Sequence, residues 1–171
     1  PLREGEQYGI DMASHQGSID WQAVARDDID FAYVKATEGA DFTDRRFRSN
    51  WRGARVSGLD RGAYHCFTLC SPGAAQARQF LRVAPPTVAA IAPAVDLELA
   101  GNCSARPSSA EVRRQLRTFT TEVERAWGQQ LVFYVGDDWD RAYPTRATAH
   151  RPLWHRRILL RPDLDGWTIW Q

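Results

Sequence analysis

The sequence is poor in lysine, in cysteine and in long apolar runs. Lys35 is the only lysine among 22 basic residues, which 21 acidic residues balance to a net charge of +1. With no charge excess, nothing indicates a nucleic-acid partner or a membrane surface. No apolar run approaches the ~18 residues that a membrane span needs. The three cysteines, Cys66, Cys70 and Cys103, leave at least one thiol free or paired outside the chain, and their spacing fits no zinc site.

The rest of the composition is that of a globular protein. The 171 residues are 43% hydrophobic and 25% charged, which excludes disordered, collagen-like and low-complexity chains. The length suits one domain, and the chain shows neither a repeat nor a linker. It begins with Pro1 rather than Met, so we expect that the N-terminus was trimmed.

Short apolar, β-branched or aromatic runs alternate with helical patterns. The runs predict five strands, over residues 8–12, 29–36, 61–67, 91–99 and 131–135. This alternation predicts a parallel sheet covered by helices, either a barrel or an open doubly wound sheet. No glycine-rich phosphate turn follows the first run, so the usual signature of a nucleotide-binding open sheet is missing.

Candidate N-caps precede four helical patterns between these runs. The caps and helices are Asp20 with residues 21–26, Thr43 with a helix that stops at Gly58, Ser71-Pro72 with residues 74–83, and Ser108 with a helix that stops at Gly128. Cys70 and Cys103 fall in loops after neighbouring strands of the expected sheet. These two cysteines could therefore form a bridge, which would leave Cys66 as a buried, free thiol.

Polar side chains collect where the expected strands end. In a parallel barrel these ends meet on one face, and that face carries the active site. Several strands contribute independently, which makes the convergence stronger evidence than any one residue. The polar residues at strand ends are Asp11, Lys35, Glu38, Tyr64, His65, Asp96 and Glu98.

Asp96 and Glu98 form the most informative pair. Residues two apart on a strand point to the same side, with Cα atoms roughly 6.6 Å apart at a rise of ~3.3 Å per residue. Their neighbours are apolar, and burial with mutual repulsion would raise one pKa enough for a neutral acid near about pH 6 to 7. A glycosidase needs one proton donor and one anion near an oxocarbenium-like centre. The alternative is that Asp96 caps a loop and Glu98 pairs with an arginine.

The other candidates also have purely structural interpretations. Asp11 could be a turn residue, Lys35 and Glu38 could pair across a loop, and His15 and His65 are more often hydrogen-bonded structural histidines than ligands. The tryptophans of the C-terminal third, which could stack on sugars or fill the core, are Trp139, Trp154, Trp167 and Trp170.

Seven segments follow one another in a recognisable order. They are GIDMASHQGSIDW (9–21), FAYVKATEG (31–39), NWRGARVSGLDRGAYHCF (50–67), PAVDLE (93–98), LVFYVG (131–136), PLW (152–154) and WTIWQ (167–171). Together they resemble glycoside hydrolase family 25, the lysozymes of the bacterial and phage N-acetylmuramidase type. Each segment alone is only a weak match to the family. Seven segments in the correct order over essentially the whole chain make a highly specific match.

The resemblance implies a modified TIM-like β/α barrel with fewer than eight helices. It implies hydrolysis of the β-1,4 bond from N-acetylmuramic acid to N-acetylglucosamine in the glycan strands of peptidoglycan, without a metal ion or an organic cofactor. We expect a monomer that is secreted or associated with the cell wall, and a phage endolysin is the alternative.

The same resemblance assigns roles by matching motif. Glu98 resembles the general acid, and Asp96 the carboxylate that orients or assists the 2-acetamido group of the substrate. Asp11 resembles the second acidic residue of the site. The residues that we expect to bind substrate or line the cleft are Tyr64, Lys35, Glu38, His65, Tyr134 and Trp170.

The sequence departs from the family pattern at three places. GAYHC replaces the commoner GAYHF, so Cys66 stands where an aromatic side chain usually packs, and DMAS replaces the commoner DVS-type start. The pattern ends at Gln171, whereas family members usually continue with a segment that completes the last strand and supplies another aspartate to the cleft. We therefore expect one catalytic domain, residues 1–171, that lacks its C-terminal closing segment.

Three other functions compete with the muramidase. A chitinase-like glycosidase of family 18 would carry further aspartate upstream of the D-x-E pair, where this chain has Ile91 and Ala94. A metal-dependent enzyme would use four ligands, namely Asp11, His65, Asp96 and Glu98. The third is a glycan-binding remnant of family 25 that the shortened C-terminus leaves catalytically impaired.

Overall fold

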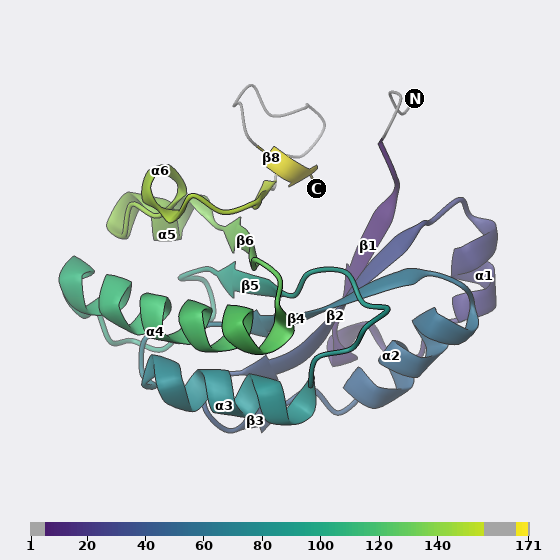
Figure 1. The fold of residues 1–171 in the computed structure, drawn as a ribbon, viewed down its shortest axis with the longest axis horizontal. Helices are drawn as coiled ribbons and strands as arrows, with labels where there is room; N and C mark the ends of the chain where they lie inside the picture. The colour runs from purple at the N-terminus through teal and green to yellow at the C-terminus, as the bar shows by residue number, and fades with distance from the viewer. Residues whose placement is uncertain (1–5, 156–166, 171) are drawn as a thin grey trace.

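The computed structural model describes residues 6–155 and 167–170. Its strands are β1 (Gly9–Met12), β2 (Phe31–Glu38), β3 (Phe42–Thr43), β4 (Asp60–Cys66), β5 (Ala94–Leu97), β6 (Val132–Val135), β7 (Leu153–His155) and β8 (Trp167–Trp170). They form one curled sheet in the order β1-β2-β4-β5-β6-β7-β8, with β3 paired to β2 (Figure 1). All pairs along this path are parallel, and β3 alone of the described strands runs antiparallel to its neighbour.

Six α-helices and one 3₁₀ turn occur in the described residues. They are the 3₁₀ turn (Ser14–Gln16), α1 (Trp21–Arg26), α2 (Phe47–Val56), α3 (Gly73–Val83), α4 (Ser109–Trp127), α5 (Asp137–Ala142) and α6 (Arg146–Ala149). Both α2 and α3 pack against β2, and α3 packs along α4, so helices cover one face of the sheet (Figure 1). The predicted TIM-like fold with fewer than eight helices is confirmed. None of these helices combines the length and the apolar character that crossing a membrane requires.

The five strands predicted from apolar runs are present as β1, β2, β4, β5 and β6, with ends that differ by at most three residues. By contrast, β3, β7 and β8 have no counterpart among the predicted strands. Two of them, β3 and β7, have only two and three residues, which is too short for apolar alternation to stand out from loop sequence.

Two helices begin at the residues that the sequence suggests. The Asp20 carboxylate caps α1 by accepting a hydrogen bond from the backbone N–H of Ala23 at 3.0 Å. The Ser108 hydroxyl likewise accepts from the N–H of Glu111 at 3.3 Å and caps α4. Gly128 ends α4 with φ +68°, a left-handed conformation that glycine adopts without strain.

The predicted start of α2 is wrong. Thr43 does not cap this helix, because it belongs to β3, where it pairs with Thr37 of β2. The helix begins later, at Phe47. Asp44 supports the turn before it, since its carboxylate accepts a hydrogen bond from the N–H of Arg46 at 2.8 Å. Pairing with the end of β2 therefore outweighs the local capping signal.

The predicted N-cap of α3 is also wrong. The helix begins at Gly73 with no side-chain cap from Ser71 or Pro72. Instead, the N–H of Gly73 donates to the side-chain oxygen of Gln115 on α4 at 2.6 Å. A Cβ at Gly73 would collide with the backbone carbonyl of Gln115. The close contact between α3 and α4 thus requires glycine here and satisfies the first N–H of the helix.

The sheet buries side chains on both faces. Val95 and Leu97 of β5 are fully buried in the large apolar cluster between sheet and helices. Alternate residues point to the opposite, inner face. A second, smaller cluster lies there, made of Tyr33, Ala94, Val132, Tyr134 and Trp154. Asp96, between Val95 and Leu97, and Glu98, just after Leu97, therefore project toward the inner face, away from the helices.

A disulfide joins Cys70, in the loop after β4, to Cys103, in the loop after β5, and Cys66 is a free thiol. This is the bridge that the positions of the two loops allow, and Cys66 is half-buried rather than fully buried. The bridge spans 33 residues of sequence. It therefore ties together the two loops that follow the central strands of the sheet.

We expect the double substitution Cys70→Ser/Cys103→Ser to lower the free energy of unfolding by about 3 to 4 kcal/mol, because a crosslink of this span restricts the unfolded chain by about that amount. Urea unfolding followed by circular dichroism measures the change. Wild-type protein kept in dithiothreitol is the matched control and should unfold like the variant. Equal stability of the variant and the oxidised wild type would contradict the prediction.

Candidate active site

The inner face of the sheet opens into a cleft of about 580 Å³ at the carboxyl ends of the strands. Strand register places Cys66, Asp96 and Tyr134 side by side on β4, β5 and β6. Most residues that the sequence singles out come together here. The predicted site residues that line the cleft are Asp11, Lys35, Glu38, Tyr64, Asp96, Glu98 and Tyr134.

Asp96 is the central carboxyl of the cleft. The Cys66 thiol donates a hydrogen bond to its Oδ2 at 3.2 Å, and its Oδ1 is buried without a hydrogen-bond partner in the described part of the chain. Burial, and next the negative charge of Glu98, raises the pKa of Asp96 to about 7. The Asp96–Glu98 pair therefore keeps one proton up to about that pH, as the spacing of two carboxyls among apolar residues predicts.

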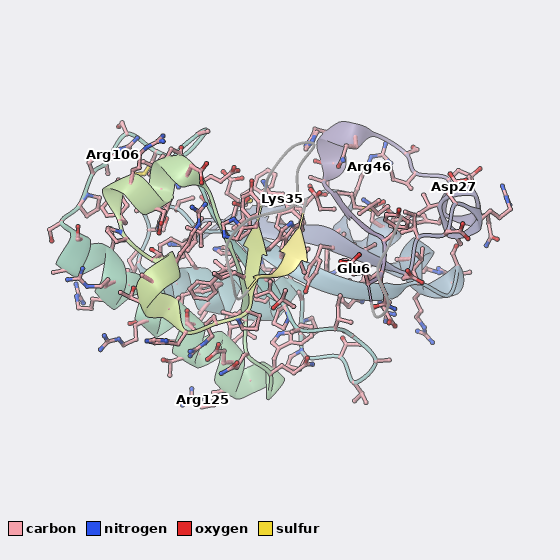
Figure 2. All side chains as sticks on the ribbon, turned by 90° about the horizontal axis from the view of Figure 1, so that it is seen from above. Glu6, Asp27, Lys35, Arg46, Arg106 and Arg125 are labelled. Carbon is pink, nitrogen blue, oxygen red and sulfur yellow. A yellow bond between two sulfur atoms is a disulfide. The ribbon has the colours of Figure 1, made fainter. Side chains whose placement is uncertain are left out.

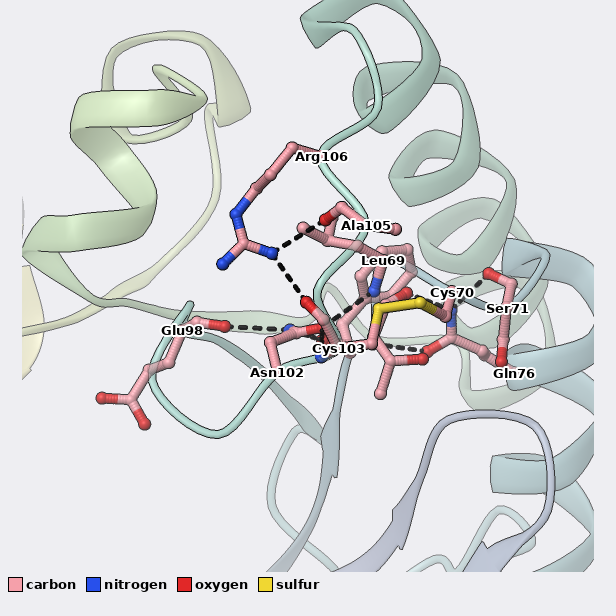
Figure 3. The surroundings of a disulfide bond; sticks show 11 residues. Leu69, Cys70, Ser71, Gln76, Glu98, Asn102, Cys103, Ala105 and Arg106 are labelled. Atoms are coloured by element: carbon pink, nitrogen blue, oxygen red, sulfur yellow. Dashed lines mark hydrogen bonds between the residues drawn. A yellow bond between two sulfur atoms is a disulfide. The ribbon is translucent and has the colours of Figure 1, made fainter.

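Glu98 follows directly after β5 and is held from two sides. The Tyr134 hydroxyl donates to its Oε1 at 3.1 Å, and the Asn102 amide donates to its backbone carbonyl at 2.9 Å. The Asp138 carboxylate accepts hydrogen bonds from the N–H groups of the two residues after Glu98, at 3.1 and 3.0 Å. The Glu98 carboxylate points away from Asn102 and the neighbouring disulfide (Figure 3). The turn after β5 thus fixes where this carboxylate can reach.

Lys35 and Glu38 form an ion pair at the edge of the cleft, with Nζ and Oε2 2.6 Å apart. Residues three apart on a regular strand face opposite sides, but β2 has a register shift between Lys35 and Thr37. This irregularity brings both charged groups to the inner face. Lys35 lies near the middle of the molecule seen from above, whereas labelled residues such as Arg125 lie toward its edge (Figure 2).

Asp11 and Tyr64 complete the described acidic and phenolic lining of the cleft. Asp11 comes from β1, and Tyr64 lies on β4 opposite Lys35 in the strand register. Burial, followed by neighbouring acidic groups that include Asp11 and Asp96, raises the pKa of Tyr64. The phenol therefore stays protonated and offers a neutral hydrogen-bonding hydroxyl.

His65 does not reach the cleft, so the expectation that it binds substrate is wrong. It follows Tyr64 on β4 and therefore faces the helices, where it is fully buried and stacks on Phe119. Its Nδ1 accepts a hydrogen bond from the Thr37 hydroxyl at 2.7 Å, and its Nε2 donates to the Gln76 side-chain oxygen at 3.0 Å. Burial lowers its pKa to about 4, so His65 is a neutral core residue.

The tryptophans divide between core and cleft. Trp139 is fully buried in the outer core, where its Nε1 donates to Thr145. Trp154 of β7 lines the cleft and packs against Tyr134. The backbone of Trp170 belongs to β8, but its side chain, for which a substrate contact is predicted, lies outside the described residues, as does that of Trp167.

Several residues of the site have no place among the predicted site residues. Asn102, Cys66 and His15 line the cleft, and Asp138 holds the turn after Glu98. Asp138 follows the strand over residues 132–135, so the rule that polar residues cluster at strand ends could have found it. The sequence gives no comparable signal for Asn102. Its hydrogen-bond partners include Phe67 and Leu69, which only the fold brings close to it.

In the described ranges, no group of three or more His, Cys, Asp or Glu side chains is arranged to hold a metal ion. The ligand set of the metal-dependent alternative also loses His65, which faces the opposite side of the sheet.

A carboxyl pair at the strand ends of a β/α barrel is typical of glycosidases that work by acid catalysis. This chain belongs to the glycosyl hydrolases family 25, whose model matches residues 10–171. The resemblance on which the sequence predictions rest is thereby confirmed. The match covers every strand of the sheet that carries a candidate catalytic carboxyl.

Solved structures of the family share the fold. A family 25 glycosyl hydrolase from Bacillus anthracis superimposes with a TM-score of 0.90 at 32% identity, covering 100% of this chain and 81% of that chain. A bacterial lysozyme from Streptomyces coelicolor gives a TM-score of 0.81 at 27% identity, covering 98% of this chain and 82% of that chain.

Curated relatives extend the similarity to the level of sequence. The protein YegX of Escherichia coli K12 is 34% identical over 172 residues, which are 96% of this chain and 62% of that protein. Lysozyme M1 of Streptomyces globisporus is 47% identical over 73 residues, which are 42% of this chain and 25% of that protein. The chain thus spans about three fifths of the length of YegX.

Proposed function

We propose that this chain is an N-acetylmuramidase that hydrolyses the β-1,4 bond from N-acetylmuramic acid to N-acetylglucosamine in peptidoglycan. The observation that carries the proposal is the Asp96–Glu98 pair in the cleft of a family 25 chain, with the Tyr134 hydroxyl on Glu98. Relatives named as lysozymes and muramidases support the choice of substrate.

Glu98 acts as the general acid. Its Oε1 accepts the Tyr134 hydrogen bond, which leaves Oε2 to carry the proton toward the 4-oxygen of the departing N-acetylglucosamine. As the bond from C1 to this oxygen breaks, the proton of Glu98 moves to the oxygen and the electron pair leaves with it. Positive charge then develops at C1 of the N-acetylmuramic acid ring.

Asp96 supplies the negative charge that stabilises the positive charge developing at C1. In its ionised form it orients the 2-acetamido group of the substrate and stabilises the positive charge at C1. A water molecule bonds to C1 either directly or after the acetamide oxygen has done so first, and the proton that this water loses goes to the carboxyl pair. Asp11 serves as the second acidic residue of the site, and Tyr64 and the Lys35–Glu38 ion pair bind the sugar along the cleft.

We further propose that residues 1–171 form one catalytic domain that acts outside the cytoplasm, secreted or associated with the cell wall, with a phage endolysin as the alternative. The Cys70–Cys103 disulfide supports this placement, because such bridges persist in oxidising compartments and are rare in the cytosol. The partner is the glycan strand of peptidoglycan, which the protein binds as a monomer.

The proposal is tested by adding the protein to purified bacterial walls. We expect turbidity to fall and mass spectrometry of borohydride-reduced fragments to find N-acetylmuramic acid at the new reducing ends. Reduced N-acetylglucosamine ends would identify a glucosaminidase and contradict the proposal. Binding to the walls without new reducing ends would identify a glycan-binding remnant instead.

A further inference from the structure

The free thiol Cys66 lies in the cleft against Asp96. It is the last residue of β4, faces the inner side of the sheet and is the register partner of Asp96. Its Sγ lies 3.2 Å from Asp96 Oδ2 and donates a hydrogen bond to it. Burial, and next the negative charge of Asp96, raises the pKa of the Cys66 thiol, so the sulfur keeps its proton and acts as a donor.

Asp96 has little other support for a negative charge. In the described part of the chain, its Oδ1 is buried and has no hydrogen-bond partner. A buried carboxylate oxygen without a donor disfavours ionisation. Within the described structure, the hydrogen bond from the Cys66 thiol to Oδ2 is therefore the one that stabilises the ionised form of Asp96.

Each strand that packs near Asp96 contributes a charged or titratable side chain to its surroundings. Glu98 and Asp11 disfavour its negative charge, and Lys35 favours it. The ammonium of Lys35, however, is also engaged by Glu38 at 2.6 Å. The groups that face Asp96 are Asp11 from β1, Lys35 from β2, Tyr64 and Cys66 from β4, Glu98 after β5 and Tyr134 from β6.

We propose that Cys66 is a positioning residue that directs the proton of the Asp96–Glu98 pair onto Glu98. One proton shared between two carboxyls can sit on either, and only one arrangement is productive. A thiol that donates to Asp96 favours the ionised form of Asp96 and so shifts the shared proton toward the general acid. This role rests on the proposed function, in which Glu98 is the proton donor.

Two substitutions of Cys66 test the role in opposite directions. Cys66→Ala removes the donor, so the midpoint of the Asp96 titration should move up by about 0.5 to 1 pH unit, and kcat should fall by about three- to tenfold. Cys66→Ser keeps a donor and makes it stronger, so the midpoint should move down while kcat stays within about twofold of wild type. Carboxyl ¹³C NMR measures the titration, and reducing-sugar release measures kcat.

The control is Thr118→Ala on α4, which also removes a single hydrogen-bond donor but lies outside the cleft. This variant should leave the Asp96 titration and kcat unchanged. Equal midpoints in wild type, Cys66→Ala and Cys66→Ser, or shifts in the same direction, would overturn the proposed role of Cys66. The serine variant is nearly isosteric, so it tests the role even if the alanine variant unfolds.

The two proposals fail in different ways. If the wild type releases muramic acid ends and the Cys66 variants titrate like it, the role of Cys66 is wrong and the proposed function stands. If the midpoints shift in opposite directions while no protein hydrolyses peptidoglycan, the hydrogen bond tunes Asp96 but the proposed function is wrong.

Discussion

Glu98→Gln should reduce the release of reducing sugar from purified peptidoglycan by about 100- to 10,000-fold, the range that loss of a general acid produces. Glutamine has the same shape, and its oxygen can accept the Tyr134 hydrogen bond that Glu98 Oε1 accepts now. The cleft should therefore keep its geometry. What disappears is the proton for the departing 4-oxygen, so the effect should fall on kcat and leave binding largely unchanged.

Initial rates on wall fragments measure this loss, and circular dichroism with urea unfolding checks the fold. The matched control is Glu122→Gln, the same chemical change on α4 and outside the cleft. That variant should hydrolyse peptidoglycan at the wild-type rate. Undiminished hydrolysis by Glu98→Gln would contradict the assignment of Glu98 as proton donor.

Asp96→Asn should reduce kcat by about 100- to 1,000-fold, the size of effect seen when a preorganised electrostatic contact to the transition state is lost. Asparagine preserves the size of the side chain but removes the negative charge that would face the developing cation at C1. The matched control is Asp27→Asn, at an exposed position at the end of α1. This control should leave kcat unchanged. Wild-type rates in Asp96→Asn would contradict the electrostatic role.

The same variant has a predicted signature in the pH profile. The wild-type activity should fall as pH rises through about 7, because burial and then the charge of Glu98 let the carboxyl pair keep its last proton up to that pH. In Asp96→Asn the fall in activity through about pH 7 should disappear, because the carboxyl whose pKa burial raises has been replaced by an amide. An unchanged alkaline midpoint would show that the pair does not share the titrating proton.

Strand alternation explains much of what could be predicted about the site. Asp96 and Glu98 are two residues apart, and both line the cleft, as a period of two requires. The same rule excludes His65, because its neighbour Tyr64 faces the cleft and adjacent residues on a strand point to opposite sides. Alternation along β4 therefore places His65 on the side of the helices.

Lys35 and Glu38 show where alternation fails. They are three residues apart, yet both line the cleft, because the register shift in β2 changes the side on which later residues project. Nothing in the segment VKATEG marks this irregularity. It follows from pairing with β4, whose own sequence lies more than twenty residues further along the chain.

Alternation and motif spacing predict five strands, four helices, the carboxyl pair and the family, because both are local properties of the chain. The tertiary structure alone shows which groups hold these carboxyls: Tyr134 on Glu98, Cys66 on Asp96 and Asn102 on the turn after Glu98. Each of the first two contacts joins residues at least 30 positions apart. The physical reason is that parallel strands bring such residues into register, and the burial that results raises the pKa of Asp96.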